Sequence, residues 1–178
     1  KDLNSNKDIS VPGGIAHFLE HKLFEDKEDS IFDKFSALGA YTNASTGFTN
    51  TNYIFSSTEN FKEALLNLLD FVQEPYFTDE NVEKEKGIIA QEINMYEDNP
   101  DWKVFFNLLK GMYVKHPIRI PIAGSVDSIM KITKDELYTY YNTFYHPQNM
   151  ALFLAGDLDI DITIDTIRDN QNKKEFTE

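Results

Sequence analysis

Apolar residues recur every three or four positions along much of this 178-residue chain, which is the spacing of helices that bury one face. A helix is predicted to begin near Ile15, directly after the Pro-Gly-Gly run of residues 12–14. An amphipathic helix is predicted over 29–38, where Gly39 suits its C-terminal cap. The same spacing predicts further helices behind a cap at Ser57 or Thr58, over 79–97, over 101–113, behind the capping box at 133–136 and from Ile160 onward.

Three other stretches predict strands. Residues 40–46 and 52–58 are rich in β-branched and aromatic side chains and flank a short polar connection, which indicates a β-hairpin. The apolar run from Met150 to Ala155 predicts a buried strand. Strands that interleave with helices indicate an α+β fold, in which an antiparallel-rich sheet packs against several helices. A single domain over residues 1–178 is expected.

Composition and charge narrow the range of functions. Thirty acidic residues against seventeen basic ones give a net charge of -13, which disfavours nucleic acid and anionic membrane surfaces as partners. The chain has no cysteine, so disulfides, thiolate metal sites and cysteine nucleophiles are excluded. It also has no apolar run of about 18 residues. A cytoplasmic location is expected.

The segment His17-Phe-Leu-Glu-His21 carries the strongest chemical signal. Two imidazoles four residues apart on a helix share a face and can coordinate one metal ion from the same side. In a chain without cysteine, a carboxylate is the common choice for a third ligand. Glu20 lies beside such an ion and is predicted to be the general base that takes a proton from water.

The predicted helix over 79–97 supplies the carboxylates. Glu85 and Glu92 are seven residues, or two turns, apart and therefore share one face. Gly87 and Ala90 are small enough to predict a close approach to the first helix. We assign Glu92 to one zinc ion per domain and Glu85 to a supporting position.

Four stretches resemble the pitrilysin, insulinase and mitochondrial processing peptidase family of zinc metallopeptidases, whose mark is an inverted H-x-x-E-H motif. The resemblance spans about residues 11–159 and is carried by residues 14–24, Asn43 to Thr46 with Tyr53, residues 85–100, and residues 116–124 with Asn149, Met150, Gly156 and Asp157.

The resemblance implies zinc-dependent endopeptidase activity on peptides or unfolded segments. It makes His17, His21 and Glu92 the metal ligands, Glu20 the general base and Glu85 an auxiliary acidic residue. It also places Asn43 and Ala44 on an edge strand to which substrate adds as a further strand.

Family resemblance further indicates a bacterial, cytoplasmic-type member. This family usually has strands before the motif, and a second homologous half or subunit closes a chamber around the substrate. Substrate-anchoring residues come from that half, so this stretch, as a fragment of a two-half enzyme, is expected to cleave poorly alone.

Two non-catalytic alternatives stay open. One is a homologous scaffold subunit, although such subunits typically lose motif residues and all four are present here. The other is a zinc-binding or peptide-binding module without turnover.

Other candidate side chains are expected to be structural. His116 and His146 each precede a proline, which favours a turn, and Arg119 and Asp127 are expected to support local structure. The aromatic stripe of Trp102, Phe105 and Phe106 could line a peptide pocket, but a stripe at helical spacing more often belongs to the core, so it is expected there and is left out of the site.

Overall fold

The computed structural model describes residues 10–27 and 30–176, so the polar start of the chain, the first residue of the helix predicted over 29–38 and the last two residues lie outside it. Within the described residues the helices are α1 (Ile15–Leu23), α2 (Ile31–Ala37), α3 (Phe61–Gln73), α4 (Asp79–Glu97), α5 (Pro100–Met112), α6 (Val126–Ile129), α7 (Lys134–Phe144) and α8 (Ile160–Gln171). The strands are β1 (Tyr41–Thr46) and β2 (Thr51–Ser56), and the 3-10 turns are η1 (Pro117–Arg119) and η2 (Pro147–Asn149).

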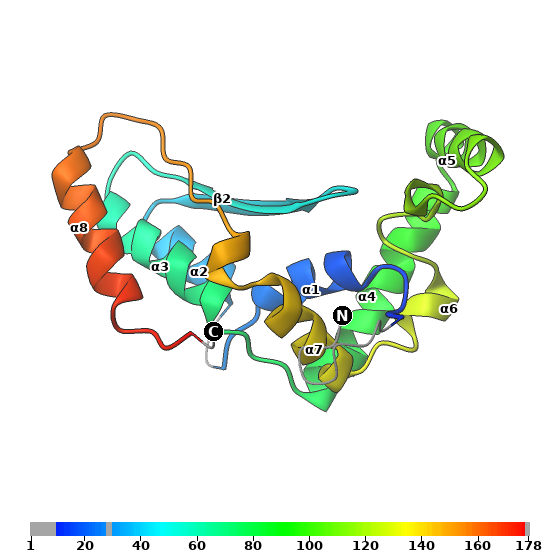
Figure 1. The fold of residues 1–178 in the computed structure, drawn as a ribbon, viewed down its shortest axis with the longest axis horizontal. Helices are drawn as coiled ribbons and strands as arrows, with labels where there is room; N and C mark the ends of the chain where they lie inside the picture. The colour runs from blue at the N-terminus through cyan, green and yellow to red at the C-terminus, as the bar shows by residue number, and fades with distance from the viewer. Residues whose placement is uncertain (1–9, 28–29, 177–178) are drawn as a thin grey trace.

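The hairpin of β1 and β2 lies over a layer of helices (Figure 1). Helices α1 and α2 contact β1, α3 contacts β2, and α8 packs along α3 at one end of the molecule. At the other end, α4 packs against α1 and continues into α5, which projects away from the rest. The predicted mixture of helices with an antiparallel hairpin is confirmed.

The two strands pair in an antiparallel register that matches Asn43 with Ile54 and Ala44 with Tyr53. Alternate residues point towards the helices, as expected for a strand with one covered face. The inward residues are Thr42, Ala44, Thr46, Thr51, Tyr53 and Phe55.

Helix α1 lies at the centre of the hydrophobic core. Phe18 and Leu19 are fully buried, and residues from α2, α3, α4 and α7 pack around them. Lys22, which directly follows the H-x-x-E-H motif, is also buried, and its ammonium group pairs with Glu25. Lys22 therefore supports the fold, and it is not among the residues that line the candidate metal centre.

Two glycines hold the segment before α1 against the loop that follows η1. Gly14 has φ +92, and a Cβ there would lie 2.4 Å from the carbonyl oxygen of Ala123. Gly124 has φ +76, and a Cβ there would lie 2.3 Å from the carbonyl oxygen of Gly13. Both positions require glycine for conformation and for space. This contact fixes where α1, and therefore His17, begins.

Two predictions about the secondary structure were wrong. Met150 to Ala155 forms no strand in the described structure, and Phe153 is 88% exposed. A strand needs a neighbour for its backbone hydrogen bonds, and no described segment pairs with this one. The predicted cap of α3 at Ser57 or Thr58 is replaced by Asn60, whose side chain instead donates to the carbonyl oxygen of Leu38 at 3.1 Å.

Candidate metal centre and substrate cleft

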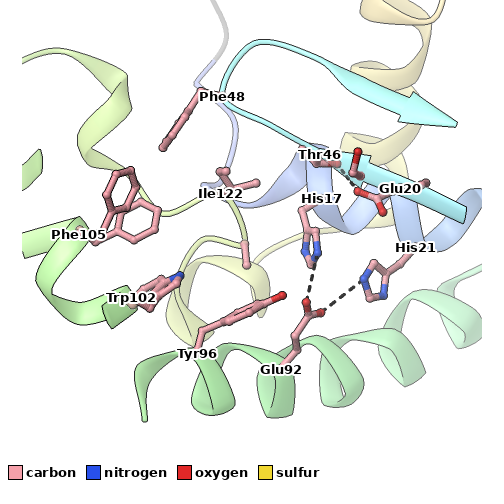
Figure 2. A pocket seen from close by; sticks show the side chains of 14 residues that line it. His17, Glu20, His21, Thr46, Phe48, Glu92, Tyr96, Trp102, Phe105 and Ile122 are labelled. Atoms are coloured by element: carbon pink, nitrogen blue, oxygen red, sulfur yellow. Dashed lines mark hydrogen bonds and ion pairs between the residues drawn. The ribbon is translucent and has the colours of Figure 1, made fainter. Parts of the chain in front are cut away.

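The inner faces of α1 and α4 bring three predicted ligand residues together. His17 and His21 lie one turn apart on α1, with their ring centroids 4.6 Å apart. The Glu92 carboxylate faces both rings, 3.6 Å from Nε2 of His17 and 3.4 Å from Nε2 of His21 (Figure 2). One ligand atom from each residue lies within 4.8 Å of the others.

This geometry fits a metal ion. The distances of 3.4 and 3.6 Å exceed the 2.7–3.2 Å of ordinary N–H···O hydrogen bonds. They are close to the roughly 3.3 Å that separates two ligands of a tetrahedral zinc ion bound at about 2.0–2.1 Å. Nε2 of each ring faces the Glu92 carboxylate, so each imidazole can offer that nitrogen to one ion. Two histidines and one carboxylate could hold zinc and leave a coordination position open.

Glu85 orients one of these imidazoles. Its side chain is only 6% exposed, and its Oε1 lies 2.9 Å from Nδ1 of His21. A carboxylate at this position accepts the Nδ1 hydrogen, which leaves Nε2 to face Glu92. The structure therefore places Glu85 behind His21, a candidate ligand, and outside the cluster of candidate ligands.

The two imidazoles differ in their electrostatic surroundings. Burial, helped by the neighbouring His21, holds the pKa of His17 below its usual value. Burial also acts to lower the pKa of His21, but the hydrogen bond to Glu85 and the charges of Glu85, Glu92 and Glu20 outweigh it and raise that pKa. These surroundings favour the neutral, metal-binding form more strongly at His17 than at His21.

Glu20 lies beside the cluster on the same helix and lines the cleft. Its side chain is largely covered, and the Thr46 hydroxyl at the end of β1 donates a hydrogen bond to its carboxylate. The Thr46 hydroxyl also lies 3.3 Å from the Thr51 hydroxyl of the paired strand. Sequence reasoning gave Thr46 no role, because this contact joins residues 26 positions apart.

The cluster opens into a cleft of about 500 Å³ between the hairpin and α5. Apolar side chains form the wall opposite the histidines (Figure 2). They are Phe48, Trp102, Phe105, Phe106 and Ile122. Tyr96 also lines the cleft, and burial together with its hydrogen bond to Glu92 raises its pKa.

The prediction that the aromatic stripe of α5 belongs to the core was correct only for part of it. Phe106 is buried, but it also reaches the cleft and contacts Phe48 at a centroid distance of 6.2 Å. Phe105 is 48% exposed and lines the cleft with Trp102. Helical spacing identifies an apolar face and not what covers it, so the sequence signal was present but was read as core.

The predicted substrate strand lies at the edge of the cleft. Ala44 lines the cleft, and Asn43 next to it accepts the Ala44 amide hydrogen on its side-chain oxygen at 2.9 Å. Among the described residues β1 pairs only with β2, so its other edge is open. Whether substrate adds there stays a prediction.

Three remaining expectations have clear outcomes. The prediction that Gly87 permits close helix packing was wrong, since Gly87 faces solvent with nothing within 4 Å of its missing Cβ. His116 and His146 do form turns, because each ring accepts an amide hydrogen two residues ahead. Arg119 supports its loop by donating to the carbonyl oxygen of Val114 at 2.9 Å.

Two models of known protein families match this chain. The model of the insulinase family, peptidase family M16, matches residues 5–126. The chain belongs to peptidase family M16. A second model of the same group, the peptidase M16 inactive domain, matches residues 131–178. Residues from both matched parts, among them Phe18 and Leu137, share the core.

The relatives agree with this assignment. An uncharacterized zinc protease of Bacillus subtilis, YmfH, is 57% identical over 176 residues, which are 99% of this chain and 41% of the relative. An M16-like peptidase structure from Alicyclobacillus acidocaldarius has a TM-score of 0.95 at 52% identity and covers 98% of this chain and 41% of its own. A protease from Helicobacter pylori shares the fold, with a TM-score of 0.87 at 22% identity over 98% of this chain and 44% of its own.

The chain thus spans about two fifths of the length of these relatives. None of the helices in residues 10–27 and 30–176 is both long and apolar enough to cross a bilayer.

Proposed function

We propose that this chain carries the catalytic centre of a zinc-dependent endopeptidase that hydrolyses peptide bonds in peptides or unfolded segments. The observation that carries the proposal is the meeting of His17, His21 and Glu92 from two helices, with Glu20 beside them on the cleft. Relatives named as zinc proteases support the choice of metal.

His17, His21 and Glu92 would hold one zinc ion, with Glu85 orienting His21. When bound, zinc lowers the pKa of its water and polarises a carbonyl group. Glu20 takes a proton from the attacking water and passes it to the nitrogen of the leaving amine. Thr46 holds the Glu20 carboxylate at the cleft wall, so the base is positioned before substrate arrives.

Substrate would bind as an extended segment along the open edge of β1. Main-chain hydrogen bonds at Asn43 and Ala44 are indifferent to side-chain identity, which suits a peptidase of broad specificity. The aromatic wall of the cleft would hold an apolar side chain of the substrate near the scissile bond. Because a strand must be extended to add to an edge, peptides and unfolded segments fit and folded domains do not.

A second homologous half or subunit is part of the proposal. The matched stretch is only 41% of a relative such as YmfH, so the relatives are more than twice as long and have room for a second half. A cytoplasmic location for this protein also remains part of the proposal.

The Glu20→Gln variant of the intact protein tests the function. We expect hydrolysis of an unfolded test protein such as casein to fall by about 10²- to 10⁴-fold, the usual contribution of a general base. Zinc content should stay unchanged, because the ligands are intact.

Glu97→Gln provides the control, since Glu97 is an exposed carboxylate on α4 that does not line the cleft. Undiminished hydrolysis by Glu20→Gln would overturn the assigned base. Intact zinc binding with no hydrolysis by the unaltered protein would favour a scaffold subunit.

A further inference from the structure

The segment from Trp102 to Val126 differs in charge from the rest of the chain. It contains no Asp or Glu, although the chain has 30 acidic residues, and it carries Lys103, Lys110, Lys115 and Arg119. It forms α5 and the loop after it, at the end of the molecule opposite α8 (Figure 1). A positively charged region is therefore present on a protein whose net charge is -13.

Three of these four cations surround one concavity of about 350 Å³, which we call the basic hollow. Its polar lining consists of Lys110, Lys115, His116 and Arg119. Its apolar lining consists of Val114, Pro117, Ile120 and Pro121. No carboxylate side chain lines it, so the side-chain groups it offers to a ligand are donors.

These donors are available to a ligand. In the part of the chain that the structure describes, no carboxylate forms an ion pair with Lys110, Lys115 or Arg119. Arg119 uses one Nη1 hydrogen on the carbonyl oxygen of Val114, and its guanidinium has further donors. His116 accepts the Ile118 amide hydrogen on Nδ1 at 3.2 Å, which leaves Nε2 as the donor of the neutral ring.

The basic hollow adjoins the substrate cleft. Phe106 lines the cleft and Lys110 lines the hollow, one turn or roughly 6 Å further along α5. Pro121 lines the hollow and its neighbour Ile122 lines the cleft. The distance along α5 from Trp102 to Lys110 is about 12 Å. An extended peptide covers that distance with about four residues.

We infer that the basic hollow is a subsite for a carboxylate of the peptide substrate, which it binds while the scissile bond lies at the metal centre. The inference rests on the proposed function, because it needs a peptide in the cleft. The carboxylate comes either from an Asp or Glu side chain or from the peptide C-terminus, since both offer the same planar acceptor to Arg119 and the lysines. Peptides with a carboxylate about four or more residues from the scissile bond are the preferred substrates.

Calorimetric titration of the intact, zinc-loaded Glu20→Gln protein tests this subsite without cleavage of the probe. The probes are unlabelled peptides of about twelve residues with an amidated C-terminus and one Glu moved stepwise along the sequence. Each has a Gln counterpart, and a further Gln peptide has a free C-terminus.

We expect one register of Glu, or the free C-terminus, to bind roughly 3- to 10-fold more tightly than the amidated Gln peptide at low salt, because exposed ion pairs contribute modestly. The gain should shrink at high salt. In the double variant Lys110→Gln/Lys115→Gln this gain in affinity should disappear, while the affinity for the amidated Gln peptide should stay the same.

The matched control is Lys103→Gln/Lys131→Gln, which removes the same charge from exposed lysines that line neither concavity. Equal binding of Glu, Gln and free-C-terminus peptides would overturn the subsite, as would an equal loss of the gain in the control variant. Because binding is measured without turnover, these outcomes are independent of whether the unaltered protein hydrolyses casein.

Discussion

At the candidate metal centre the important side chains come from two helices packed in the core, whereas the wall of the cleft is built from exposed residues of α5. Glu20 and Glu85 are buried, and each is held by a hydrogen bond from another element. Phe105 is half exposed and is free to meet a ligand. Groups that must keep a fixed geometry are thus anchored in the core, and groups that recognise substrate stand on a projecting helix.

This contrast predicts that substitutions at the candidate metal centre lower zinc affinity or kcat, and that these effects are large. Substitutions on α5 should raise KM for the substrate, and these effects should be small. The following variants of the intact protein test that division.

Among the next three variants, the largest effect is expected for Glu85→Gln. Loss of the charge behind His21 weakens the orienting hydrogen bond and the basicity of the ligand, so zinc affinity should fall by about 10- to 100-fold. Competition with a chelator of known affinity measures it, with Glu97→Gln as the control. Unchanged zinc affinity would mean that Glu85 does not act through His21.

A smaller effect is expected for Thr46→Val, which removes the hydroxyl that holds Glu20 and keeps the side-chain shape. We expect kcat to fall by roughly 10-fold, on the scale of one lost hydrogen bond to a charged group, with KM and zinc content nearly unchanged. Thr46→Ser should restore most of kcat. A rise in KM with normal kcat would instead place Thr46 in substrate binding.

The smallest effect is expected for Phe105→Ala. It removes apolar surface from the cleft wall, so KM for peptides should rise by about 3- to 10-fold while zinc content stays the same. Val104→Ala is the control, because Val104 lies on the same helix but does not line the cleft. A fall in zinc content in Phe105→Ala would contradict the division between the two regions.

Local signals explain what the sequence predicted correctly. Helix α4 was predicted with its actual bounds because Thr78 caps it and Pro100 begins the next helix. The juxtaposition of His17 with His21 needs only helical spacing, and their meeting with Glu92 was expected from the family resemblance as well.

Other features that depend on contacts between residues far apart in the sequence were not predicted correctly. The apolar run at Met150 to Ala155 looked like a buried strand, but it has no neighbouring strand in the described structure. The contact between Thr46 and Glu20 depends on how the hairpin lies over α1, and no spacing rule encodes it. The basic hollow likewise required the fold, because Lys110 and Arg119 meet only when the loop turns back onto α5.

Elemental analysis of the intact protein and its Glu92→Ala variant tests the central claim most directly, with Glu97→Ala as the control. We predict about one zinc per chain in the unaltered protein and in the control, and little zinc in Glu92→Ala, because a half-buried pair of histidines without its carboxylate holds the ion poorly. Absence of zinc from the unaltered protein, or full zinc content in Glu92→Ala, would contradict the proposed centre.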